Sequence, residues 1–138
     1  MDDGFTKEEW KMRVETKKIL DPNIDLVAHC VRVPVFIGHS EAVFMECKKD
    51  IDEKNVRSLL RDANGVTVVD HRADEGYVTP EEVAGEDDVY ISRIRKDPSV
   101  KNGIVFWCVG DNLRKGAALN TVQIAELLVS KKIKGVPL

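Results

Sequence analysis

An arginine and a histidine that could bind and protonate a small acid lie close together in the segment CVRVPVFIGHSEAV. Arg32 has the planar guanidinium that binds a carboxylate through two hydrogen bonds, and His39 exchanges protons near neutral pH. In an extended strand these residues would lie roughly 23 Å apart and on opposite faces. They share a site only if the chain bends at Pro34 or Gly38. Taken alone, the residue types favour a surface arginine and a turn histidine.

Two further places carry polar groups at a meaningful spacing. Glu8 and Lys11 are three residues apart on one face of a predicted helix. They form either an exposed ion pair or two contacts to a ligand that has an ammonium and an anionic group. The segment GDNLRKGAALN begins the last predicted helix, whose free N–H groups favour a polar or anionic ligand group. An ordinary capped helix packed against a sheet is the alternative there.

The three cysteines, Cys30, Cys47 and Cys108, lie in apolar stretches and have no C-x-x-C spacing. Only Cys47 has positive charges beside it, so none of the three is predicted to be an activated nucleophile. They are expected to be core or edge thiols in a reducing cytoplasm. Histidines and cysteines show no ligand spacing, and no metal site is predicted.

The elements that must position these residues follow from hydrophobic periodicity and from helix breakers. Their order predicts an α+β fold with a mainly antiparallel or mixed sheet. No G-x-G-x-x-G motif is present, so no dinucleotide-binding unit is expected in this chain. Helices are predicted at residues 6–20, 52–63 and 111–132, strands at 26–35, 40–47, 65–70, 88–95 and 102–110, and a loop with one short turn at 71–88. Thr6 and Glu9 form a predicted capping box for the first helix. Asp111 or Asn112 is the predicted cap of the last helix, whose apolar residues predict burial on several sides.

Length and charge limit the function classes. A chain of 138 residues buries one core, so one domain or part of one is expected. A net charge of -3 gives no reason to expect a nucleic acid or an anionic membrane as partner. No apolar run approaches the roughly 18 residues that cross a bilayer, and the N-terminus does not read as a signal peptide.

Four segments together resemble bacterial aspartate-β-semialdehyde dehydrogenases over Thr6 to Leu128. They are TKEEWKM-x-x-ETKKIL, CVRVPVFIGHSEAV, TPEEVAGEDDVYISRIRKDPS and DNLRKGAALNTVQIAELL. The resemblance implies an incomplete C-terminal domain like that of glyceraldehyde-3-phosphate dehydrogenase, with helices on one face of the sheet. It implies reduction of β-aspartyl phosphate with NADPH to aspartate β-semialdehyde and phosphate, on the path to lysine, methionine and threonine. In that reaction a cysteine attacks the acyl phosphate, and hydride transfer to the thioester gives the aldehyde.

The resemblance also implies roles for single residues. His39 looks like the acid/base histidine of the family, and Arg32 like the arginine that binds the substrate carboxylate. Glu8 resembles the glutamate near the substrate amino group, and Lys11 the lysine that helps to bind phosphate. Asn112 is similar in position to the residue near the nicotinamide of the cofactor.

The family's nucleotide-binding domain and its Asn-Cys motif, which carries the nucleophile, are absent from residues 1–138. The chain is therefore expected to be a partial C-terminal domain that is inactive alone, with NADP bound mainly by the absent domain. The terminal helix at 111–132 is expected to pack on that domain, and the sheet to form a homodimer with a second copy. The alternatives are a fragment similar to N-acetylglutamyl-phosphate reductase, or a stand-alone dimerisation module without catalytic function.

Overall fold

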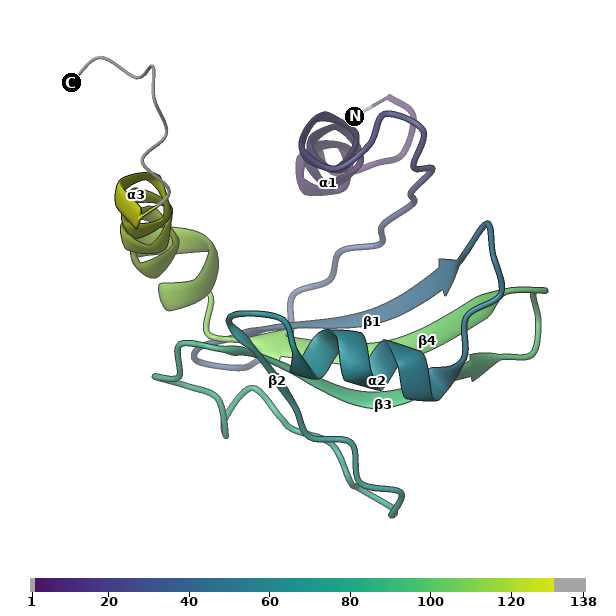
Figure 1. The fold of residues 1–138 in the computed structure, drawn as a ribbon. Coiled ribbons are helices and arrows are strands. Elements are labelled where there is room, and N and C mark those ends of the chain that lie inside the picture. Colours follow the sequence, from purple (N-terminus) through teal and green to yellow (C-terminus); the bar gives the residue numbers. More distant parts are fainter. Residues whose placement is uncertain (1, 131–138) are drawn as a thin grey trace. The chain divides into compact units, whose positions relative to one another are not determined.

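The chain divides into two compact units, Met1–Pro34 and Val35–Leu138. The structure, a computed structural model, describes residues 2–130 (Figure 1). Within these residues, the first unit holds helix α1, and the second holds a four-stranded sheet with helices α2 and α3. This is the α+β class that the order of predicted elements indicates. No helix in the described residues is long and apolar enough to cross a membrane.

Helix α1, Lys7–Ile19, begins where the sequence predicts, because its N-terminus carries a complete capping box. Thr6 Oγ1 accepts a hydrogen bond from the Glu9 N–H at 3.2 Å. The Glu9 carboxylate accepts one from the Thr6 N–H at 2.7 Å. Acidic residues in the first turn and basic residues in the last turn also suit the helix dipole. The boundaries of α1 therefore follow from local sequence signals.

The segment after α1 differs from the prediction, because residues 26–35 form no strand. Their β-branched side chains favour extended backbone, but the described sheet contains no strand from this segment. A side chain holds the segment instead, since the Cys30 N–H donates to Glu9 Oε1 of α1 at 2.7 Å. Extended propensity does not make a strand where no neighbouring strand supplies hydrogen-bond partners.

The sheet of the second unit has the strand order β1-β4-β3-β2 (Figure 1). Strand β4 lies antiparallel between β1 and β3, and β2 adds parallel to β3 at the edge. The expected mixed, largely antiparallel sheet is therefore confirmed. The strands are β1, His39–Glu46, β2, Val66–Val68, β3, Val89–Asp97, and β4, Gly103–Gly110.

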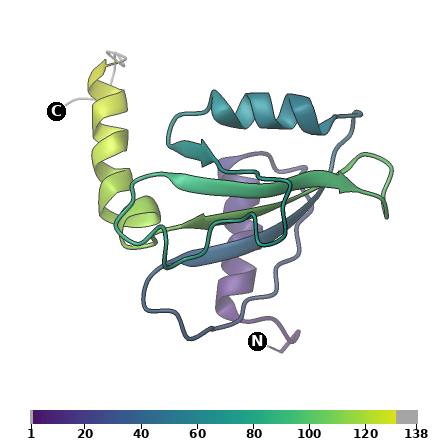
Figure 2. The same ribbon diagram turned by 90° about the horizontal axis from the view of Figure 1, so that it is seen from below.

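Helix α2, Glu53–Arg61, packs along one face of the sheet (Figure 2). Asp52 caps its N-terminus, because its carboxylate accepts a hydrogen bond from the N–H three residues later at 2.7 Å. The apolar stripe of the helix then brings Val56 into a core with three isoleucines of β3 and β4. These are Ile91, Ile94 and Ile104.

The acidic segment between β2 and β3, expected to be mainly loop, covers part of the opposite face. Val78 and Val83 of this loop are buried in a second small core beside β4. Trp107 Nε1 of β4 donates to the Val78 carbonyl at 2.8 Å. The chain also turns at residues 80–85, where the Thr79-Pro80 pair predicts one short turn. One face of the sheet thus carries a helix, and the other an ordered loop.

The last helix starts later than predicted. Arg114–Ala118 form a kinked turn in which Gly116 has φ +91°. Helix α3, Leu119–Ser130, follows, and the predicted residues 131 and 132 lie outside the described part of the chain. A glycine at positive φ interrupts a helix, and the apolar pattern of the segment hides this break. No residue of α3 is buried here, although the pattern predicts a helix buried on several sides.

Candidate functional site

His39 is the first residue of β1, and it pairs with Gly110 at the end of β4. The residue before it, Gly38, has φ +107°, which L side chains rarely adopt. A Cβ at this position would lie 2.9 Å from Cβ of Pro80. Gly38 therefore lets the chain bend into β1, as the sequence predicts for this breaker, and brings His39 to one end of the sheet.

Asn112 lies at the same end of the sheet, two residues after β4. Its Oδ1 accepts a hydrogen bond from the Gly38 N–H at 2.9 Å, across 74 residues of sequence. Two of the predicted site residues, His39 and Asn112, are thus brought together through Gly38. Within the described residues, this bond to Oδ1 is the one hydrogen bond of the Asn112 side chain, and Nδ2 donates to no acceptor.

The buried Asp111 fixes the backbone from which the Asn112 side chain extends. Its side chain accepts hydrogen bonds from the N–H groups of Gly85 and Leu113, each at 2.8 Å. The residue is only 3% exposed. These backbone donors, Gly85 first, hold the pKa of the carboxyl below its usual value. Sequence reasoning treats Asp111 only as a possible helix cap, and nothing local signals its bond to the loop before β3.

Glu8 and Lys11 lie on one face of α1, as their spacing predicts. Lys11 Nζ is 3.2 Å from Glu8 Oε1, and both side chains are exposed to solvent. Exposed pairs of this kind contribute little to stability. Breaking this ion pair therefore costs little, and each of the two charged groups can bind an oppositely charged group of a ligand instead.

Arg32 is exposed and follows the segment that Glu9 holds against α1. Glu9 is 5% exposed and accepts the N–H groups of Thr6 and Cys30, both at 2.7 Å. These two donors, Thr6 first, lower the pKa of the carboxyl. Arg32 itself makes no ion pair within residues 2–130. The sequence predicts only a capping role for Glu9. In the structure Glu9 also joins α1 to the segment that contains Cys30 and Arg32.

The predicted site residues belong to different units of the chain. Glu8, Lys11 and Arg32 belong to the first unit, whereas His39 and Asn112 belong to the second. Within the first unit Glu8 and Lys11 are in contact, and Arg32 lies two residues after Cys30, which Glu9 binds; within the second unit Asn112 binds the residue before His39. A single site that contains all five remains a prediction.

The cysteines do not add a nucleophile to these groups. All three are partly buried, and none of them is in a disulfide bond within residues 2–130. Burial of Cys108, with a smaller contribution from the charge of Glu41, raises its pKa to about 11. A thiol with so high a pKa carries almost no thiolate at neutral pH and reacts slowly. Within residues 2–130 no three His, Cys, Asp or Glu side chains gather to hold a metal ion.

Comparison with known proteins gives the same family over nearly the whole chain. The family described as "Semialdehyde dehydrogenase, dimerisation domain" matches residues 1–115. Aspartate-semialdehyde dehydrogenase of Aquifex aeolicus is 50% identical over 131 residues, which are 94% of this chain and 38% of that protein. The Bacillus subtilis enzyme of the same name is 46% identical over 129 residues, which are 92% of this chain and 37% of that protein.

A solved structure agrees with these sequence matches. Aspartate semialdehyde dehydrogenase II of Vibrio cholerae, complexed with ASA, aligns with a TM-score of 0.87 and 47% identity. The alignment covers 94% of this chain and 38% of that one. The chain thus spans less than half the length of the relatives it matches. It belongs to the family of semialdehyde dehydrogenase dimerisation domains.

Proposed function

We propose that this chain is the C-terminal, substrate-binding and dimer-forming part of an aspartate-semialdehyde dehydrogenase. The complete enzyme would reduce β-aspartyl phosphate with NADPH to aspartate β-semialdehyde and phosphate. The observation that carries the proposal is the 50% identity to an enzyme of that name over 131 residues, a stretch long enough to include the proposed site residues. The rest of the enzyme, with the nucleophile, would come from a part that these residues do not contain.

Each proposed role matches the chemistry of a side chain. His39 would donate and accept the proton during attack of the nucleophile and release of the product. Arg32, which has no ion-pair partner in residues 2–130, would bind the substrate carboxylate with its two-pronged guanidinium. Glu8 would bind the substrate ammonium and Lys11 the phosphate. The exposed Glu8–Lys11 pair supports this, because a ligand reaches both groups from solvent.

The cofactor that this function implies is NADP, whose reduced form would supply the hydride for reduction of the substrate acyl group. Of the residues in this chain, Asn112 fits a contact to its nicotinamide. The Asn112 Nδ2 group has no hydrogen-bond acceptor within the described residues, while Oδ1 is occupied by Gly38. A donor therefore remains for a carboxamide or ribose oxygen.

Replacing Arg32 with lysine in the complete enzyme should raise KM for aspartate semialdehyde by about tenfold or more. Lysine keeps the charge but loses the second parallel hydrogen bond to the carboxylate, and such charge-assisted bonds contribute about 1.5–3 kcal/mol. The measurement is initial rate of NADP reduction in the reverse direction with phosphate present. Arg61→Lys, at the exposed end of α2, is the matched control. An unchanged KM would remove Arg32 from the substrate site.

We also propose that the sheet forms a homodimer with the sheet of a second copy. The family description supports this, and so does β1, an edge strand in which every residue except Val43 is exposed. Phe44 is 69% exposed on this strand. It is opposite Val105 of β4, so it lies on the sheet face away from α2. An exposed aromatic side chain in the middle of a strand is typical of an interface.

Light scattering during size-exclusion chromatography tests the dimer directly. At micromolar concentration the chain should have the mass of two copies, whereas Phe44→Lys should shift it toward one copy. Leu59→Lys is the matched control, because Leu59 is 65% exposed on α2. A wild-type monomer at all these concentrations would refute the dimer. A fully dimeric Phe44→Lys variant would place the interface elsewhere.

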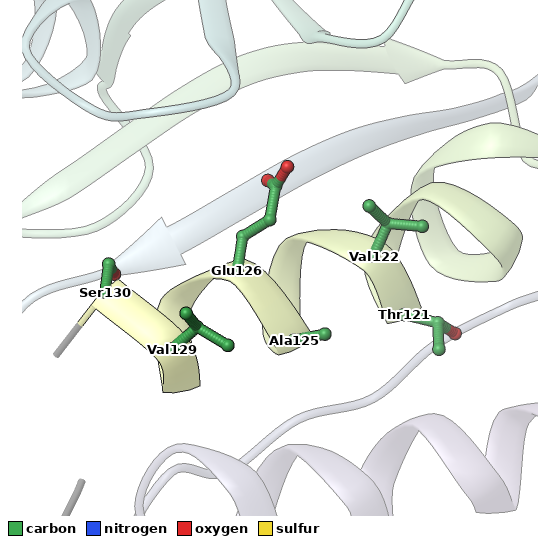
Figure 3. A pocket seen from close by; sticks show the side chains of 6 residues that line it. All are labelled: Thr121, Val122, Ala125, Glu126, Val129 and Ser130. Atoms are coloured by element: carbon green, nitrogen blue, oxygen red, sulfur yellow. The ribbon is translucent and has the colours of Figure 1, made fainter. Parts of the chain in front are cut away.

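Helix α3 carries a second exposed apolar surface. Val122, Ile124 and Val129 are each more than half exposed. Figure 3 shows the side of the helix around Val122, Ala125 and Val129, where Glu126 is the one charged side chain drawn. We propose that this helix packs on the nucleotide-binding part of the complete enzyme. The relatives contain further residues that could form that part, because this chain covers only 38% of the Aquifex aeolicus protein.

The proposed reaction also suits a reducing compartment. Three cysteines in a chain of 138 residues, none of them in a disulfide bond within residues 2–130, favour such a compartment. The substrates are small polar metabolites that dissolve in water. We therefore propose that the enzyme acts in the cytoplasm.

A further inference from the structure

We propose that Asn112 is a positioning residue for His39, and that it acts through the N–H of Gly38. This inference rests on the proposed function, because it concerns the acid/base role of His39. The contact that carries it is the 2.9 Å hydrogen bond from Gly38 N to Asn112 Oδ1. It joins the residue directly before His39 to the turn that leads toward α3.

Among the described residues this hydrogen bond adds to a small set of contacts that hold the backbone around His39. β1 is an edge strand, so His39 pairs on one side only, with Gly110. Gly38 has no side chain to restrict it, and glycine loses more conformational freedom on folding than other residues. Asn112 supplies a fixed acceptor at this flexible position, and Pro80 limits movement on another side.

Asn112 is itself held rigidly, as a positioning residue must be. The Asp111 carboxylate accepts the N–H groups of Gly85 and Leu113. The Asp111 carbonyl accepts those of Arg114 and Lys115 at 3.2 and 2.8 Å. The backbone on both sides of Asn112 is therefore fixed to β4, to the loop before β3 and to the turn that follows. A rigid support of this kind keeps a functional group within the small tolerance that catalysis needs.

The two ends of the Asn112 carboxamide can be tested separately. Oδ1 binds Gly38, whereas Nδ2 has no acceptor in the described residues and is the end available to a cofactor. Asn112→Asp keeps an acceptor for Gly38 but removes the Nδ2 donor. Asn112→Ala removes both. An effect that arises from positioning should therefore be large in Asn112→Ala and mostly restored in Asn112→Asp.

Hydrogen exchange of the Gly38 amide in the 138-residue chain, followed by NMR, tests the positioning without any activity measurement. Exchange should be about tenfold or more faster in Asn112→Ala than in the wild type, and close to wild type in Asn112→Asp. The His39 amide and ring resonances should move in Asn112→Ala only. Unchanged Gly38 exchange and unchanged His39 resonances in Asn112→Ala would overturn the proposal.

Kinetics of the complete enzyme then separate the two roles. Loss of positioning should lower kcat by about tenfold or more in Asn112→Ala, because small misplacements of a catalytic group are costly. Asn112→Asp should lose less of kcat than Asn112→Ala, because it keeps the acceptor for Gly38 and loses only the Nδ2 donor. A rise in KM for NADP in both variants would assign Nδ2 to the cofactor. Equal loss of kcat in both variants, together with unchanged Gly38 exchange in Asn112→Ala, would overturn the positioning role and assign the loss to Nδ2. A wild-type enzyme without dehydrogenase activity, combined with the expected exchange behaviour, would refute the proposed function alone.

Discussion

Replacing His39 with alanine in the complete enzyme should lower kcat by about 10²–10⁴-fold, the range for loss of a general acid/base group. The residue begins β1 and is exposed at the end of the sheet, so its ring is open to a substrate. The substrate carboxylate is assigned to Arg32 and not to His39, so KM should change much less than kcat. Stopped-flow or steady-state measurement of NADP reduction gives both constants.

Two controls make the His39 result specific. His71→Ala, in the exposed loop after β2, should leave kcat within a few-fold of wild type. Added imidazole should restore part of the activity of His39→Ala, because a free imidazole in the vacated space carries the same proton. Near-normal turnover of His39→Ala would refute the acid/base assignment. A large loss that imidazole does not restore would point to a structural effect at the start of β1.

The parts of the fold that could be predicted are those set by neighbours in sequence. The capping box of Thr6 and Glu9 defines the start of α1, and Asp52 that of α2. The segment at 26–35 was wrongly predicted as a strand, because its β-branched residues say nothing about whether a partner strand exists. The last helix was predicted to start too early, because its apolar residues outweighed Gly116. The first error arises because strand pairing depends on distant residues, whereas the second arises because a local signal, Gly116, was given too little weight.

The candidate site shows the same division. The types of Arg32 and His39 allow acid binding and proton transfer but taken alone favour a surface arginine and a turn histidine, and only the family resemblance implies the two roles. The bend at Gly38 is visible in the sequence. The hydrogen bond between Gly38 and Asn112 is not, because it joins residues 74 positions apart. The buried carboxylates of Glu9 and Asp111 are likewise read as caps, whereas their longer-range bonds to Cys30 and Gly85 depend on the folded chain.

A buried ion pair between α2 and the residues that follow β2 is a place where a single substitution should strongly destabilise this chain. Asp70 Oδ2 is 2.5 Å from Arg57 Nε, and the Asp70 side chain is 1% exposed. Its second oxygen accepts the N–H of Ile94 at 3.2 Å, while Arg57 donates to the Ile94 carbonyl at 2.7 Å. The ion pair therefore binds both backbone polar groups of Ile94 in β3, the N–H and the carbonyl.

That residue lies in an irregular part of the strand. Ser92 pairs with Trp107 and Arg95 with Val105, so two residues of β3, at 93 and 94, stand opposite one residue of β4. Arg93 has φ +57° in this bulge. A bulge leaves backbone groups without their ladder partners. Arg57 and Asp70 take the place of these ladder partners for Ile94. This explains why buried charged side chains join α2 to the bulge in β3.

Asp70→Ala should therefore lower the free energy of unfolding by about 3–5 kcal/mol, the usual cost of removing one partner from a buried ion pair. Glu53 is still 3.2 Å from Arg57, which favours the lower part of this range. With typical slopes for urea, a loss of 3 kcal/mol moves the unfolding midpoint down by about 1–3 M. Circular dichroism of the 138-residue chain in urea measures this shift.

The matched control is Asp50→Ala, which removes the carboxylate of an exposed pair with Lys96 at 2.9 Å. Asp50 is 82% exposed, so water can solvate Lys96 once the carboxylate is removed. The unfolding midpoint should therefore move far less than in Asp70→Ala. Equal shifts in the two variants would mean that the Asp70 pair contributes no more than a surface pair. The bulge in β3 would then be held by its apolar contacts, chiefly those of the fully buried Ile94.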